Sequence, residues 1–141
     1  MKSITMTQTF NAPQQEIFDY LSEHNNLGPI LNANISRIKD ADGSNPNGLG
    51  SVRSIKIGFE LLQETIVTFD SPNLIEYKIT NNAPVKYHLG RLEFSTPEQG
   101  KTFLSYTIDM ESKIGFADGF ITFILETIIK RGLKNLAAKY N

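Results

Sequence analysis

The chain has 141 residues, a length typical of one domain, and its 14 basic and 15 acidic residues give a formal net charge of -1. This balance excludes the domain-wide positive field that drives counterion release from nucleic acid, so we expect no nucleic-acid partner. The absence of cysteine excludes disulfide bonds, thiolate metal sites and a cysteine nucleophile. We therefore expect one domain over residues 1–141.

The N-terminal segment MKSITMTQTF predicts a half-buried strand, because Ile4, Met6 and Phe10 share one parity and threonines occupy the other. The same alternation differs from the continuous apolar core of a signal peptide, so we expect a cytoplasmic protein. The next segment, NAPQQEIFDYLSEH, has Pro13 in a first helical turn, followed by apolar residues at helical spacing. Gly28 then interrupts the helical pattern. We expect a kinked pair of short helices here.

Six short strands are predicted between Ile35 and Ser112, separated by the turn-forming sequences DGSNPNG, GF, DSPN, NNAP and PEQGK. Connections this short join antiparallel strands, because parallel strands need crossovers of about a dozen residues or more. Within these strands Tyr77, for example, lies between Glu76 and Lys78, so one face of the sheet is expected to be apolar and the other polar and exposed to solvent. The apolar face must be buried against another element of the fold.

The C-terminal segment FADGFITFILETIIKRGLKNLAAKY predicts an amphipathic helix that covers the apolar face of the sheet. Its polar residues Thr122, Glu126, Lys130 and Lys134 recur every four positions and are expected to face solvent. The apolar stretch GFITFILETIIK is shorter than the roughly 20 residues that cross a bilayer, so we do not expect an integral membrane protein. The residues expected to face the sheet are Phe116, Phe120, Phe123, Ile124, Ile128, Leu133, Leu136 and Tyr140.

The order of these elements predicts an α+β domain whose sheet curls around the last helix. The segments FNAPQQEIFDYLSEHNNLGPIL, GLGSVR, DSPNLIEYKI and LGRLEFST...GKTFLSYTI, in this order, resemble the START-like or SRPBCC (Bet v 1-like) superfamily. Within that superfamily the chain is most similar to the polyketide cyclase/dehydrase and lipid-transport branch. The resemblance covers essentially the whole chain.

The resemblance implies a helix-grip fold, in which a curved antiparallel sheet of about seven strands surrounds a long C-terminal helix and leaves an internal apolar cavity. Members of the superfamily bind lipids, sterols, polyketides, quinones or plant hormones, and some catalyse cyclisation or dehydration in the same cavity. They share no single catalytic motif. The function must therefore be argued from the residues that line the site.

The sequence NPNGLGSVRSIKIG raises the question whether Gly48 and Gly50 form a phosphate-binding loop. Such a loop follows a strand and opens a helix, so that backbone N–H groups and the helix N-terminus converge on the anion. Here the glycines precede SVRSIKI, which alternates as a strand does. We interpret the segment as a turn at the mouth of the expected cavity, with Gly50 allowing the chain to bend.

A two-residue turn at positions 58 and 59 would place Arg53 opposite Glu64 on neighbouring strands. If this face is the concave one, the two charges form an ion pair among apolar residues and could orient the polar end of a ligand. If it is the convex one, they form an ordinary cross-strand pair in solvent. The same register pairs Ile57 with Glu60 and Ile55 with Leu62.

The chain has two histidines, His24 and His88. The parity of apolar residues in VKYHLGRLEF changes near Gly90, which we interpret as a bulge there, so that either Tyr87 or His88 faces the cavity. A histidine in the cavity beside a carboxylate or a tyrosine could act as a general base. The alternative is a surface or hydrogen-bonded histidine with no chemical role. His24 is expected at a helix end.

We expect no metal and no cofactor, because two distant histidines without cysteine or an acidic loop form no recognisable ligand set. No G-x-S-x-G motif predicts a serine nucleophile either. The aromatic residues either fill the core or bring hydroxyl groups to an apolar cavity wall. Our candidate catalytic residues are Arg53, Glu64 and His88. Our candidate ligand-binding residues are Arg53, Ile55, Ile57, Leu62, Glu64, Tyr77, Tyr87, Tyr106, Ile108, Phe116, Phe120, Phe123 and Ile124.

Three functions are consistent with these features. The leading hypothesis is a protein that binds or carries a hydrophobic small molecule or lipid in the internal cavity. The second is a cyclase- or dehydratase-like enzyme that polarises a carbonyl group in the same cavity. The third is an interaction module, which an exposed apolar patch and a filled cavity would favour.

Overall fold

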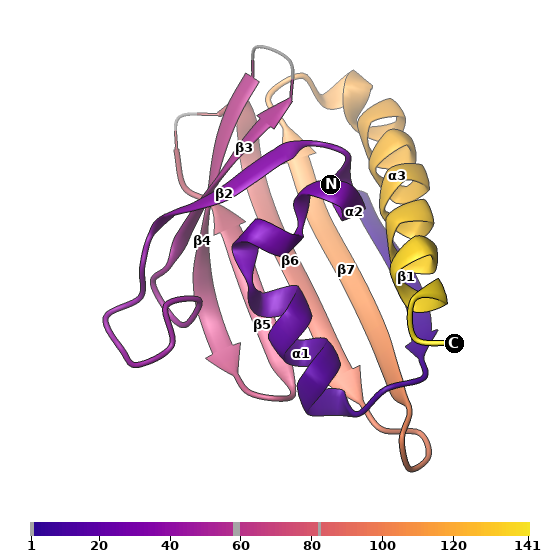
Figure 1. Ribbon diagram of the computed structural model, residues 1–141. Coiled ribbons are helices and arrows are strands. Elements are labelled where there is room, and N and C mark those ends of the chain that lie inside the picture. The colour runs from indigo at the N-terminus through magenta and orange to yellow at the C-terminus, as the bar shows by residue number, and fades with distance from the viewer. Residues whose placement is uncertain (1, 58–59, 82) are drawn as a thin grey trace.

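The computed structural model describes residues 2–57, 60–81 and 83–141, apart from the side chains of residues 57, 60 and 61 (Figure 1). Its strands form one antiparallel sheet in the order β1-β7-β6-β5-β4-β3-β2. This is the architecture expected of a helix-grip fold. The strands are β1 (Lys2–Phe10), β2 (Asn34–Lys39), β3 (Val52–Ile57), β4 (Glu60–Asp70), β5 (Leu74–Ile79), β6 (Val85–Ser95) and β7 (Thr102–Ser112).

The helices gather on one side of the sheet (Figure 1). Helices α1 and α2 cross in front of the central strands, whereas the long helix α3 runs along the edge formed by β1. The kinked pair predicted from the sequence is thus present, with a 3-10 turn between its two parts. The helices are α1 (Gln14–Ser22), η1 (His24–Asn26), α2 (Gly28–Leu31), η2 (Gly115–Ala117) and α3 (Asp118–Ala138).

The hydrophobic core lies between the helices and the inward face of the sheet. Phe18 packs edge-on against Phe69 of β4 and Phe94 of β6, with ring centroids 5.3 and 5.1 Å apart, so α1 is anchored to two strands. The other large side chains with the least exposure are Phe10, Met6, Ile17, Leu104, Ile129 and Leu133. This packing fixes which face of each strand is concave.

The contact between α3 and α2 determines how α3 is rotated about its axis. A Cβ atom at Gly132 would lie 2.3 Å from the carbonyl oxygen of Ile30, so only glycine lets the two backbones approach so closely. With Gly132 against α2, Phe123 lies nine residues earlier, about two and a half turns, and therefore on the opposite side of the helix. The buried residues of α3 are Asp118, Thr122, Ile129, Gly132, Leu133, Leu136 and Ala137.

This rotation contradicts part of the predicted amphipathic pattern. Phe116, Phe120 and Phe123 are 94, 70 and 67% exposed, so the prediction that they face the sheet is wrong. Ile124 is also exposed. Thr122, predicted to face solvent, is buried and donates its hydroxyl to the carbonyl oxygen of Asp118 at 2.8 Å. The prediction holds for the C-terminal half, where Leu133 and Leu136 are buried.

The predicted register of β3 and β4 is confirmed. Arg53 pairs with Glu64, and Ile55 pairs with Leu62, as a two-residue connection requires. The pairing of positions 57 and 60 is also as predicted, although the side chain of Ile57 and the turn at 58–59 lie outside the described part of the structure.

The irregularity in β6 lies elsewhere than predicted. The register shift falls between Val85 and Tyr87, whereas Gly90 pairs regularly with Tyr77 on β5 and with Ile108 on β7. A Cβ atom at Gly90 would lie 2.1 Å from Cζ of Tyr77, so the glycine makes room for that ring. The prediction of a bulge at Gly90 is therefore wrong. His88, rather than Tyr87, points to the inward face of the sheet.

Among the described residues, no helix is both long and apolar enough to cross a membrane.

We predict that Gly132→Ala lowers the free energy of unfolding by about 1–3 kcal/mol, because the added methyl group must push α3 away from α2. Urea unfolding at equilibrium measures this change. The matched control is Gly119→Ala on the exposed side of α3, where an added Cβ meets no other atom within 4 Å. That substitution should leave stability unchanged or raise it by up to about 1 kcal/mol. Equal effects of the two substitutions would contradict the proposed role of Gly132.

Candidate functional site

A charged pair lies on the concave face of the sheet. Arg53 of β3 and Glu64 of β4 are 4 and 6% exposed, and Arg53 Nε donates a hydrogen bond to Glu64 Oε1 at 2.8 Å. Their placement follows from the register, since directly paired residues of antiparallel strands point to the same face. Of the two arrangements considered from the sequence, the structure has the buried one.

His24 holds the other side of the Arg53 guanidinium. Arg53 Nη1 donates to Nδ1 of His24 at 3.2 Å, so the proton of the neutral ring is on Nε2, which lies 2.8 Å from the Ser51 hydroxyl. Ser51 in turn donates to the carbonyl oxygen of Gly48. Burial, reinforced by the positive charge of Arg53, lowers the pKa of His24 to about 3, so this ring is neutral at physiological pH.

The loop between β2 and β3, which contains NPNGLG, holds His24 in this position. Asn47 accepts a hydrogen bond from Arg37 Nη1 at 2.8 Å and donates to Glu23 Oε2 at 2.8 Å. Its Oδ1 also lies 3.5 Å from the backbone nitrogen of His24. Gly50 has a φ of 87°, in the left-handed region that glycine favours. The segment leads into β3, as predicted, and its buried polar groups fasten the helical layer to the sheet.

Two tyrosines extend the cluster along the concave face. Cζ of Arg53 lies 4.3 Å from the centroid of the Tyr77 ring, within the range of a cation–π contact. The hydroxyl groups of Tyr77 and Tyr106 are hydrogen-bonded to each other. Burial raises the pKa of Tyr106 to about 12 and raises the pKa of Tyr77 well above its usual value, so both hydroxyls keep their protons. One of the two remains able to donate to a further acceptor.

His88 lies on the far side of Glu64. Its Nδ1 accepts a hydrogen bond from the backbone N–H of Ile79 at 3.1 Å, so the proton of the neutral ring is on Nε2, 3.8 Å from Glu64 Oε2. Burial lowers the pKa of His88 despite the nearby carboxylate. The result is a row of polar groups, here called the polar cluster: His24, Arg53, Glu64, His88, Tyr77 and Tyr106.

The polar cluster borders a small internal cavity of about 20 Å³. A space of that size holds roughly one water molecule. Among the described residues, the space beside the polar cluster is therefore too small for the elongated cavity implied by the resemblance, because apolar side chains of the helices fill the space above the sheet. The cavity is lined by Leu21, Ser22, Leu27, Ile30, Leu31, Asn47, Arg53, Ile66, Ile75, Tyr77, Leu92, Tyr106 and Leu133.

The predicted site residues fall into three groups. Arg53, Tyr77 and Tyr106 line the cavity. The buried side chains of Glu64, Ile55 and Ile108, the half-buried Leu62 and the largely buried His88 lie on the concave face without being part of its lining. Tyr87 is exposed on the other face, Phe116 is exposed on η2, and Phe120, Phe123 and Ile124 are exposed on α3, so their assignment to the cavity wall is wrong. The predicted side chain of Ile57 lies outside the described part of the structure.

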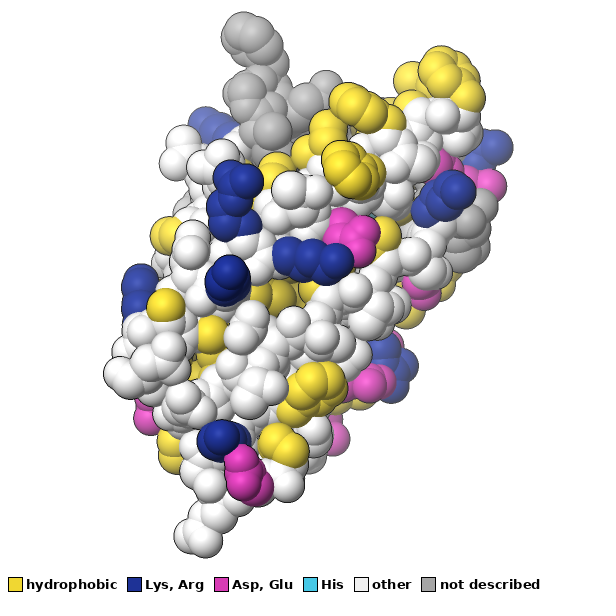
Figure 2. All heavy atoms as spheres, turned by 90° about the vertical axis from the view of Figure 1, so that its right-hand side faces the viewer, with side chains coloured by type: hydrophobic (Ala, Val, Ile, Leu, Met, Phe, Trp, Pro, Cys, Tyr) yellow, Lys and Arg dark blue, Asp and Glu magenta, His cyan; other side chains and the backbone are white. Residues whose placement is uncertain are grey.

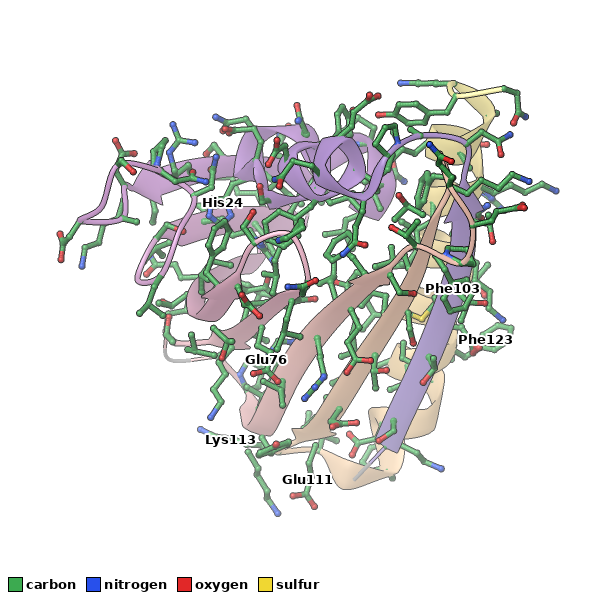
Figure 3. All side chains as sticks on the ribbon, turned by 90° about the horizontal axis from the view of Figure 1, so that it is seen from below. His24, Glu76, Phe103, Glu111, Lys113 and Phe123 are labelled. Carbon is green, nitrogen blue, oxygen red and sulfur yellow. The ribbon has the colours of Figure 1, made fainter. Side chains whose placement is uncertain are left out.

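Figure 3 shows how the labelled side chains separate. His24 lies between the helical layer and the sheet, Glu111 and Lys113 project from the opposite side of the sheet, and Phe123 points outward at its edge. His24 was not among the predicted site residues, because a histidine beside two asparagines is typical of a helix end. Its partner Ser51 is 27 residues away, and no local pattern signals that contact. Among the described residues there is no group of three or more histidine, aspartate or glutamate side chains that could hold a metal ion.

We predict that stability falls as the pH decreases from 7 to 5. In the unfolded chain a histidine binds a proton near pH 6.5, whereas His24 in the folded chain stays neutral down to a pKa of about 3. The unfolded state therefore binds more protons, and His24 alone should remove about 2 kcal/mol of stability over this interval. His88, whose pKa is also lowered, adds to the loss.

Urea unfolding at several pH values measures this dependence. The double variant His24→Gln/His88→Gln should lose most of it, because the chain has no other histidine. A slope that persists unchanged in the double variant would show that other groups cause it.

Comparison with known proteins agrees with this architecture. A solution NMR structure of a protein from Thermobifida fusca has a TM-score of 0.76 at 18% identity, covering 99% of this chain and 93% of that one. The Aha1 dimer from Colwellia psychrerythraea has a TM-score of 0.72 at 15% identity, covering 99% and 96% of the chains. Norcoclaurine synthase from Thalictrum flavum, in complex with dopamine and hydroxybenzaldehyde, has a TM-score of 0.69 at 13% identity, covering 99% and 88%.

These likenesses confirm the START-like fold that the sequence resembles. No curated protein matches the chain. The family described as polyketide cyclase / dehydrase and lipid transport matches residues 1–141. The chain therefore belongs to the polyketide cyclase/dehydrase and lipid transport family.

Proposed function

We propose that the protein binds or carries a mainly apolar small molecule or lipid in the space between sheet and helices, and that the polar cluster holds an oxygen atom of that ligand. The observation that carries the proposal is the buried pair of Arg53 and Glu64 on the concave face of the sheet, where Arg53 lines the small cavity. The family description, which includes lipid transport, supports a hydrophobic ligand, and the dopamine and hydroxybenzaldehyde named in the norcoclaurine synthase structure are small aromatic molecules that carry hydroxyl groups.

Stability alone is a poor explanation for the buried pair. The removal of two charges from water costs several kcal/mol per ion, and well-packed apolar residues in the same place are often equally or more stabilising. The hydrogen bonds that Arg53 makes to described residues come from Nε and Nη1. Arg53 lines the cavity, so we expect its Nη2, which makes no hydrogen bond to a described residue, to donate to an acceptor there. A ligand carbonyl, carboxylate or phenolic oxygen fits this donor.

Binding must be coupled to a movement of the helical layer. Ligand pockets for molecules of ordinary size occupy about 300–1,000 Å³, far more than the about 20 Å³ present here. The side chains that fill the space come largely from the α1–α2 region, namely Leu21, Leu27, Ile30 and Leu31. Helix α2 has only four residues, so its displacement breaks few helical hydrogen bonds. We expect the ligand to replace these side chains against the sheet.

A second candidate function is a cyclase- or dehydratase-like reaction in the same space. The observation that favours it is the convergence of possible acid, base and electrophilic groups. Glu64 lies 2.8 Å from Arg53 and 3.8 Å from His88, and the ring of Tyr77, whose hydroxyl is bonded to that of Tyr106, lies against the same guanidinium. Glu64 would then remove a proton while Arg53 and a tyrosine polarise a carbonyl oxygen. If so, Glu64→Gln should abolish turnover of a substrate that still binds.

We predict that 2-naphthol binds the protein more tightly than 2-methylnaphthalene, which has a similar shape but no hydroxyl. Tyr106→Phe should weaken 2-naphthol binding about two- to tenfold, because it removes one hydrogen bond while keeping the ring. Chemical-shift titration by NMR measures both affinities. The matched control is Tyr87→Phe, which removes an exposed hydroxyl from the other face and should leave binding unchanged.

The proposed recognition of a ligand oxygen would be contradicted if the unsubstituted protein bound neither probe, or bound both with equal affinity. It would also be contradicted if Tyr106→Phe bound 2-naphthol as tightly as Tyr87→Phe does. Native mass spectrometry of the protein purified from its own cells would then identify the physiological ligand. A co-purifying molecule that is apolar and has one oxygen-bearing end supports the proposal, and a molecule with no polar group contradicts it.

A further inference from the structure

The outward face of α3 and the preceding turn carry an apolar surface that the folded domain leaves uncovered. It consists of Ile114, Phe116, Phe120, Phe123 and Ile124, all exposed, and we call it the phenylalanine face. Between positions 114 and 125 the one charged residue is Asp118, which is buried and accepts a hydrogen bond from the backbone N–H of Ser112 at 3.1 Å. The solvent-facing side of this segment therefore has no charge. Figure 2 shows hydrophobic side chains gathered at the upper end of this side of the molecule.

The same helical face becomes cationic toward the C-terminus. Lys130 and Arg131 follow Phe123 and Ile124 by seven residues, or about two turns, and so lie on the same side of α3. Lys134 follows Phe123 by eleven residues, or about three turns. All three are exposed. Figure 2 shows lysine and arginine side chains below and beside the hydrophobic group.

The acidic groups on this face do not neutralise it. Glu126 is within 3.0 Å of Lys130, and this ion pair leaves Arg131 and Lys134 without a carboxylate partner on α3. An amphipathic helix with aromatic residues at one end and cations on the same face has the chemistry that binds the interface of a membrane with anionic lipids. Phenylalanine rings enter the boundary between head groups and acyl chains, and the cations meet lipid phosphates.

We propose that the outward face of α3 is a docking surface for an anionic lipid bilayer. The helix lies along the bilayer surface, with the phenylalanine face buried in it and Arg131 and Lys134 at the level of the phosphates. This docking does not depend on the ligand proposed above, because the polar cluster lies on the concave side of the sheet. The charge pattern favours lipid over a second copy of the chain, since an identical face offers no free carboxylate to Arg131 or Lys134.

Co-sedimentation with vesicles tests the proposal. The protein should bind vesicles of phosphatidylcholine mixed with phosphatidylglycerol and bind vesicles of phosphatidylcholine alone more weakly, with the difference reduced by salt. The variant Phe120→Ser/Phe123→Ser should partition at least about tenfold more weakly, because two large aromatic groups no longer enter the bilayer. The variant Arg131→Gln/Lys134→Gln should lose most of the preference for the anionic vesicles.

The matched control is Ile38→Ser/Leu49→Ser, which removes two exposed apolar side chains remote from α3 and should leave vesicle binding unchanged. Thermal unfolding of each variant shows whether it is folded, and the Tyr106→Phe variant should bind vesicles normally even if ligand binding is impaired. Vesicle binding that is absent, or equal in the phenylalanine and control variants, overturns the proposal. A dimer in size-exclusion chromatography that dissociates in Phe120→Ser/Phe123→Ser, without vesicle binding, assigns the face to a second copy instead.

Discussion

The ion pair between Arg53 and Glu64 is the interaction around which the interior of this domain is organised. The two charges lie on the concave face of the sheet, where water is largely excluded, so each needs a partner and further hydrogen bonds. His24 and His88 flank the pair on either side, and Tyr77 lies against the guanidinium. The neutral state of His24 follows from this arrangement, because burial, reinforced by the positive charge of Arg53, lowers its pKa. The proposed binding role would explain why charges occupy a place where apolar residues are often at least as stabilising.

A second constraint, the close contact of Gly132 with Ile30, decides what the long helix presents to each side. It brings a row of buried residues toward the core and turns the phenylalanines outward. The side chains that α3 contributes to the interior are consequently small, aliphatic or polar, and none of them is aromatic. The same rotation creates the exposed surface of α3.

Much of the fold could be predicted from the sequence, because strand alternation and short turns are local signals. The placement of Arg53 opposite Glu64 followed from the length of one turn. Whether this pair lies on the concave or the convex face could not be predicted in the same way, since the residues on both faces of a strand alternate with the same period. His24 and Ser51 meet only through the packing of the helical layer on a loop 27 positions away. The rotation of α3 depends on one glycine contact, which the hydrophobic pattern of the segment does not encode.

The most direct test of the central claim compares stability with binding in the double variant Arg53→Met/Glu64→Leu. If the pair serves recognition, urea unfolding should show a change of no more than about 1–2 kcal/mol, or a gain, because both charges are removed together. Titration with 2-naphthol should show that the preference over 2-methylnaphthalene is lost. A double variant that keeps this preference would contradict the assignment of the ion pair to ligand recognition.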